Sequence, residues 1–224
     1  MSATTFPDLI ILRLGDDKSV FDEKFGEKVS IIKETFVTKE LFGDVLHPVN
    51  EPRLKAIIVV PTQIGSLNQA EIRARLSRFV RAGGTVIVAF LSLTAGNDWE
   101  LDSVFWDLKR QWRVDNSAHR HARLKLSLNE SIKDKMGYAS CNLQKAYDME
   151  AVKIIGVAQN EMVYIDTKSY LSGNPAEDCY VGCPSAFARV GSGYLGYVGD
   201  LRVDSGTVAL LMAMLSKFQD APTN

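Results

Sequence analysis

Polar side chains follow several apolar segments of this sequence, at the places where an open α/β sheet would bind a ligand. In such sheets a ligand binds beyond the carboxyl ends of the strands, where the chain leaves each strand for a turn. These side chains could hold a small polar ligand, although Asp and Ser more often cap turns there. The predicted ligand-binding residues are Asp16, Asp17, Thr62, Gln63 and Ser92, and Asp200 follows a further apolar segment that would end at the same edge.

Ser92 is the hydroxyl group closest to the position where a nucleophile would stand in this arrangement. A serine reacts only when a base lies beside it, and that base would be His47, His119 or His121. One hypothesis is therefore a catalytic set of Ser92, Asp200 and one of the histidines at 119 and 121. The alternative is a serine that caps the N-terminus of the next helix, which is the commoner role.

His119 and His121 lie in a locally basic stretch, 109–125, which also contains Trp112. In a strand the two histidines would project from the same face, a spacing found in metal sites, but the sequence offers no third ligand. A solvated surface segment is the simplest interpretation. A site for an anionic ligand or an acidic partner is the second, and a metal site is the third.

The three cysteines, Cys141, Cys179 and Cys183, form an odd set in a chain without an export signal, which favours reduced thiols. The last two make a CxxxC pair with no second pair and no nearby histidine, which is too few ligands for zinc. We therefore expect no metal and no cofactor.

The overall charge points to no charged partner. Lys and Arg number 26 against 27 Asp and Glu, and no apolar run is long enough to span a bilayer. Nucleic acid and membrane binding are therefore not expected. A cytoplasmic protein is the expectation, because the first residues lack a basic and apolar leader.

The first half of the chain reads as alternating strands and helices. Apolar runs predict strands at 8–14, 55–61 and 85–91, with a helix from Asn68 to Gly83 between the last two. Strand, helix and strand in this order form a unit with parallel strands. A further helix and a further strand are expected at 19–33 and 34–42.

The second half changes character. A helix is expected at 102–112 and a half-exposed strand at 122–130, followed by short elements up to 185. A hairpin that turns at 191–193 precedes a closing apolar helix, 205–218. The predicted fold is one α/β domain over residues 1–224, a three-layer sandwich with a mostly parallel, flavodoxin-like sheet and an antiparallel elaboration at about 122–185.

Three segments in this order, "FVRAGG", "GGTVIVAFLSLTAG" and "GSGYLGYVGD", resemble the class I glutamine amidotransferase-like fold. This fold occurs in amidotransferases, in trehalose-utilisation (ThuA-like) proteins and in a non-catalytic domain of some β-galactosidases. The segments "WRVDNSAHRHARLKLSLN" and "FARVGSGYLGYVGDL" also resemble fungal proteins of this type, a similarity that brings no activity with it.

The resemblance implies a catalytic Cys after the strand at 85–91 and a His at the end of the late strand. Residues 90–96 contain no Cys, and residues 197–200 contain no His. Because function depends on the site and not on the fold, the resemblance predicts a non-catalytic domain, a pseudoenzyme that acts through a protein partner or through homo-oligomerisation. The alternative is a small-molecule hydrolase that uses the carboxyl-edge residues with Ser92 and a histidine. An apolar patch around Phe105, Trp106 and Trp112 is the expected partner surface.

Overall fold

The computed structural model describes most of the elements predicted above. The described residues are 9–14, 54–61, 69–89, 98–115, 121–132, 136, 143–167, 182–201 and 205–216. The helix and strand expected at 19–33 and 34–42 lie outside them.

The first three strands confirm the reading of the apolar runs. They are β1 (Leu9–Leu14), β2 (Ala56–Pro61) and β3 (Thr85–Ala89), and they pair in parallel in this order. All five side chains of β3 are buried, as expected for a strand that helices cover on both faces.

The helix between β2 and β3 also confirms the prediction. It is α3 (Gln69–Arg81), which packs Leu76, Phe79 and Val80 into the core. The helix ends at Arg81, and Gly83 follows two residues later with a φ of 115°, a backbone conformation that glycine adopts without strain. The predicted N-cap residue, Asn68, lies outside the described residues.

The next helix starts and ends earlier than predicted. It is α4 (Asp98–Asp107) in place of 102–112. Lys109 adopts a left-handed φ of 59°, and the amide of Arg110 donates to the carbonyl of Phe105 over 2.9 Å. This turn redirects the chain into the short strand β4 (Arg113–Val114).

The large sheet is mixed, so the prediction of a mostly parallel sheet is wrong. Its order is β1-β2-β3-β10-β9-β8-β5-β6, with parallel pairs from β1 to β10 and antiparallel pairs from β10 to β6. The direction reverses because β9 and β10 form the predicted hairpin. The remaining strands are β5 (His121–Leu128), β6 (Ala146–Val152), β8 (Met162–Asp166), β9 (Ser185–Val190) and β10 (Gly193–Val198), and β4 pairs separately with β7 (Ile154–Ile155).

The end of β6 returns to the residues that follow β10. Ala151 forms a bridge with Asp200, the amide of Val152 donates to the carbonyl of Gly199 over 2.8 Å, and the amide of Leu201 donates to the carbonyl of Glu150 over 2.9 Å. A side chain at position 199 would overlap the Val152 carbonyl oxygen, so this contact requires glycine.

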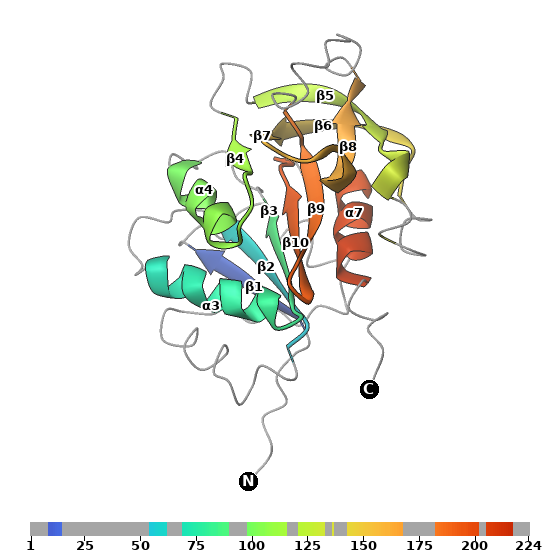
Figure 1. Ribbon diagram of the computed structural model, residues 1–224. Coiled ribbons are helices and arrows are strands. Elements are labelled where there is room, and N and C mark those ends of the chain that lie inside the picture. The colour runs from blue at the N-terminus through green and yellow to red at the C-terminus, as the bar shows by residue number, and fades with distance from the viewer. Residues whose placement is uncertain are drawn as a thin grey trace.

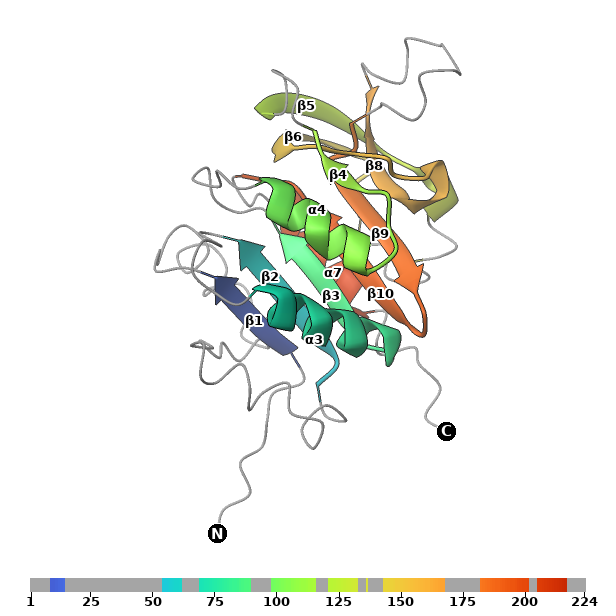
Figure 2. The same ribbon diagram turned by 60° about the vertical axis from the view of Figure 1, so that its left-hand side comes forward.

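The helices form the outer layers of the predicted three-layer arrangement. Helices α3 and α4 cover one face of the sheet, and α7 (Ser205–Ser216) covers the other (Figures 1 and 2). The flavodoxin-like topology stays a prediction, because the chain between β1 and β2 is not described. Within the described part, no helix is long and apolar enough to cross a membrane.

Candidate ligand-binding site

Most of the predicted carboxyl-edge site falls on residues that the structure does not describe. These are Asp16, Asp17, Thr62, Gln63, Ser92 and His119. The ligand site and the catalytic set proposed for this edge therefore stay predictions.

Asp200 is fully buried directly after β10. Its carboxylate accepts a hydrogen bond from the hydroxyl of Thr207, which is also fully buried. Because Thr207 lies in the first turn of α7, this bond connects the end of β10 to the start of the closing helix. Asp200 thus has a structural contact, whatever its part in the predicted catalytic set.

His121 is the first residue of β5, and its backbone lies opposite Val152 in β6. Val152 in turn contacts Gly199, the neighbour of Asp200 in the chain. The backbones of His121 and Gly199 are therefore two strand spacings apart, about 10 Å. The topology brings these two parts of the predicted set to the same end of the sheet.

Cys183 is the one predicted thiol within the described residues, and it is buried. Burial raises its pKa from 9.0 to about 12, because a thiolate is poorly solvated in the core. Its Sγ atom donates to the carbonyl of Ser185 at 3.0 Å. Among the described residues, no group of His, Cys, Asp and Glu is arranged to hold a metal ion.

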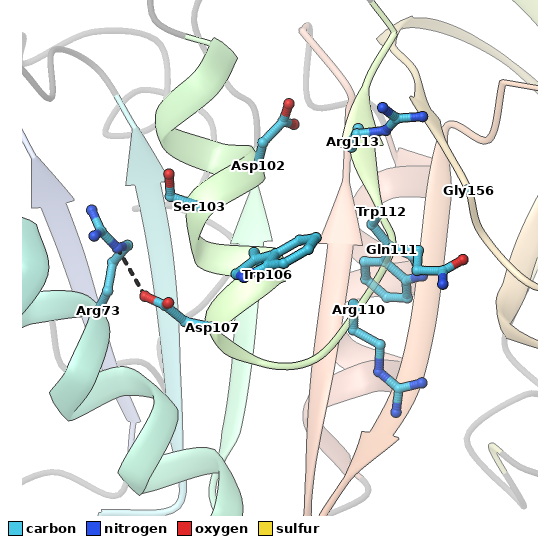
Figure 3. A pocket seen from close by; sticks show the side chains of 10 residues that line it. All are labelled: Arg73, Asp102, Ser103, Trp106, Asp107, Arg110, Gln111, Trp112, Arg113 and Gly156. Atoms are coloured by element: carbon cyan, nitrogen blue, oxygen red, sulfur yellow. Dashed lines mark hydrogen bonds and ion pairs between the residues drawn. The ribbon is translucent and has the colours of Figure 1, made fainter.

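A pocket of about 690 Å³ lies beside α4, between that helix and the chain that leads into β4 (Figure 3). It combines the indole rings of Trp106 and Trp112 with charged and amide side chains. Its lining residues are Arg73, Asp102, Ser103, Trp106, Asp107, Arg110, Gln111, Trp112, Arg113 and Gly156.

Trp106 is the exposed aromatic side chain of this pocket. It is 73% exposed, whereas Phe105 and Trp112 are 0% and 1% exposed and contact each other edge to face at 5.5 Å. The predicted apolar patch around these three residues is therefore wrong. Successive residues of a helix point about 100° apart, so burying Phe105 against the sheet turns Trp106 towards solvent.

Asp107 fixes the end of α4 to α3. Its carboxylate accepts a hydrogen bond from Arg73 Nε at 2.9 Å, and its carbonyl accepts one from Arg81 Nη2 at 2.8 Å. The guanidinium groups of both arginines, which belong to α3, reach the C-terminus of α4, where cations stabilise unpaired carbonyl groups. These two hydrogen bonds connect α3 to the end of α4 at this side of the pocket.

Glu161 holds the opposite wall. Its two carboxylate oxygens accept hydrogen bonds from Arg110 Nη1 at 2.6 Å and from Trp112 Nε1 at 3.1 Å. Arg110 also donates to the carbonyl of Arg189. Glu161 thus holds both the Arg110 guanidinium and the Trp112 indole in place.

The segment that carries Arg113 is fixed through its backbone. The carboxylate of Asp102 accepts a hydrogen bond from the amide of Val114 at 2.7 Å, and Arg113 pairs with Ile155. Gly156 follows in the left-handed region, with φ of 75°, where a side chain would overlap the Gln111 carbonyl oxygen. The Arg113 side chain is exposed.

Sequence reasoning missed Arg73, Asp102 and Asp107 as site residues. The sequence did indicate part of this pocket. Arg110 and Arg113 line it, and both belong to the basic stretch 109–125, for which an anionic ligand was one interpretation. No local sequence pattern predicts the ion pair between Arg73 and Asp107, which lie 34 residues apart in the chain.

The fold is similar to solved structures of other proteins. A β-galactosidase from Bacillus circulans sp. alkalophilus matches with a TM-score of 0.52 and 16% identity, over 95% of this chain and 31% of its own. Gan42B, a GH42 β-galactosidase from G. stearothermophilus, matches with a TM-score of 0.51 and 16% identity, over 98% of this chain and 31% of its own. The mmIFT52 N-terminal domain matches with a TM-score of 0.54 and 11% identity, over 96% of this chain and 99% of its own.

The present chain thus spans about a third of the β-galactosidase chains, and identities this low establish a shared fold alone. No family model matches the sequence, and no curated protein matches it either.

These comparisons correct the family predicted from the sequence. The similar structures named above are two β-galactosidases and the mmIFT52 domain, not glutamine amidotransferases. The motifs that suggested the amidotransferase family are glycine-flanked strands and turns. Such motifs specify a backbone path that many α/β sheets share, so they identify a family poorly.

Proposed function

We propose that this chain binds a saccharide in the pocket around Trp106. The exposed indole carries the proposal: Trp106 is 73% exposed, with polar side chains on either side of it. A pyranose ring has an apolar C–H face that packs on an indole, while its hydroxyl groups need hydrogen-bond partners around the rim. Asp102 and Gln111 supply such groups in this pocket.

The order of the pocket supports the same function. Two ion pairs hold its walls, Arg73 with Asp107 and Arg110 with Glu161. A site whose side chains are already fixed loses less conformational entropy when a ligand binds. The likeness to β-galactosidase chains supports a saccharide as the ligand class, because those enzymes act on galactosides.

The test is isothermal titration with galactose and lactose. We expect binding with a Kd of about 1 mM, which corresponds to about −4 kcal/mol. The variant Trp106→Ala should weaken it about tenfold or more through loss of the stacking surface. Met212→Ala is the matched control, because Met212 is also an exposed apolar side chain and lies on α7, across the sheet from α4. Equal affinities of the wild type and Trp106→Ala would refute the proposal.

A small-molecule hydrolase is the second candidate. The likeness to β-galactosidases favours it over the non-catalytic role. The argument for a non-catalytic domain depended on the amidotransferase family and loses its basis once that family is corrected. Hydrolysis of p-nitrophenyl galactosides by the wild type, and its loss in Ser92→Ala, would support this candidate. If the protein hydrolysed no glycoside and no ester, the hydrolase candidate would be refuted and saccharide binding would remain the proposed function.

A further inference from the structure

The pocket around Trp106 is larger than a single sugar unit requires. Its volume is about 690 Å³, and pockets of about 300–1,000 Å³ hold ligands of drug size. A disaccharide or trisaccharide has that size, whereas a monosaccharide is much smaller. One galactose unit on the indole would therefore leave much of the pocket filled with water.

The indole of Trp106 is an open platform and not part of an enclosed site. The side chain is 73% exposed, so a sugar ring stacked on it is held mainly from one face. Small ligands in well-formed pockets have about 70–90% of their surface buried. A saccharide therefore gains more contact area by extending along the pocket than by lying on Trp106 alone.

Polar side chains line the pocket on both sides of this indole. Figure 3 shows Ser103 and Asp107 on one side of Trp106, and Gln111 on the other side, in the chain that leads into β4. The fused rings of an indole are wider than one pyranose ring. A single sugar unit packed on the indole therefore does not reach past both of its edges, and a ligand that uses both sides needs a second unit.

Each side of the pocket is held by an ion pair of its own. Arg73 binds Asp107 at 2.9 Å between α3 and α4, and Arg110 binds Glu161 at 2.6 Å beside the chain that leads into β4. The two pairs share no residue, so the polar groups of each side are ordered independently. A ligand that extends across the indole then loses little conformational entropy of the protein at either end.

From these observations we propose that the pocket binds a saccharide chain of two or three units, and not a single terminal sugar. The inference rests on the proposed function and adds the length of the ligand to it. One unit packs on Trp106 with its hydroxyl groups towards Ser103. The next unit of the chain lies on the far side of the indole, towards Gln111.

The experiment compares methyl β-galactoside with β-linked galactotriose by isothermal titration, using the full chain. Wild type should bind the trisaccharide about tenfold tighter, because the added units bury further surface. Gln111→Ala should lose this preference and keep its affinity for methyl β-galactoside, whereas Ser103→Ala should weaken the binding of both sugars. Gln144→Ala is the matched control, because Gln144 is an exposed glutamine outside the pocket. It should behave as the wild type does.

The outcomes separate this inference from the proposed function. If both sugars bind equally, or if Gln111→Ala keeps the preference, the inference is overturned while saccharide binding stands. An equal loss of both sugars in Gln111→Ala would show that one unit reaches both sides of the indole, which also overturns it. If neither sugar binds, both proposals are overturned. Because Gln111 is exposed, thermal unfolding of Gln111→Ala should match the wild type, which excludes misfolding as the cause.

Discussion

At the scale of single residues, Glu161 is the acid on which the pocket wall depends. It accepts hydrogen bonds from both Arg110 and Trp112 and is largely buried, with 14% of its side chain exposed. Glu161→Gln removes the charge and one acceptor oxygen, which leaves Arg110 without its counter-charge. We expect a loss of about 1–3 kcal/mol in the free energy of unfolding, measured in urea.

The matched control for this substitution is Glu71→Gln on α3. Glu71 pairs with Arg75 one helical turn away, but 57% of its side chain is exposed. Exposed pairs of this kind contribute about 0.5 kcal/mol or less. Similar losses for the two variants would contradict the role assigned to Glu161.

Cys183 is a second residue whose surroundings fix its chemistry. Burial raises its pKa to about 12, so almost none of it is thiolate at pH 8, and only the thiolate attacks a disulfide reagent. In a variant that keeps Cys183 alone, with Cys141→Ser and Cys179→Ser, Ellman's reagent should label nothing in the folded protein. It should label one thiol in urea. Rapid labelling of the folded form would contradict the burial.

The same pKa shift makes stability depend on pH. The folded state holds the Cys183 proton more tightly than the unfolded state, whose pKa is near 9.0. The stabilisation is therefore complete below pH 9 and is lost as the pH rises towards 12. Cys183→Ala should show a smaller alkaline loss than wild type in urea unfolding followed from pH 8 to pH 10.5. An identical loss in both proteins would contradict the shift.

At the scale of elements, α4 presents two adjacent aromatic residues to opposite environments. Phe105 is fully buried and contacts Tyr197 and Trp112, whereas Trp106 faces the pocket. Phe105→Ala should therefore cost about 3–5 kcal/mol in the free energy of unfolding. Trp106→Ala should cost about 0.5 kcal/mol or less. A large loss for Trp106→Ala would mean that its ring supports the fold, and its binding defect would then need another variant.

Elements with a strong local pattern could be predicted from the sequence, and others could not. Strand β3 and helix α3 follow from an unbroken apolar run and from helical spacing closed by Gly83. The end of α4 depends on the left-handed Lys109, which no propensity favours. Strand β6 was missed because its buried and exposed residues do not alternate regularly. The pocket joins α3, α4 and β4, so its geometry arises only from their packing.

At the scale of the whole molecule, β3 and β10 lie side by side in the middle of the sheet and contribute buried side chains to the packing on both of its faces. Helices α3 and α7 contact these two strands from opposite faces of the sheet. Amide groups in such strands open only when the whole domain unfolds. We expect the slowest hydrogen exchange at 85–89 and 193–198, and much faster exchange in the two-stranded β4 and β7, measured by mass spectrometry on peptides. Equal rates in these two regions would contradict a single cooperative core.

The return of β6 to the segment after β10 also bears on aggregation. Outer strands normally leave a row of amide and carbonyl groups that can recruit a strand from another molecule. Between Glu150 and Val152, β6 is hydrogen-bonded to β5 on one side and to residues 199–201 on the other. This part of the strand has no free backbone groups to offer, so the protein is protected against strand addition here. Gly199, whose missing side chain permits the contact, is thus a safeguard against self-templated assembly.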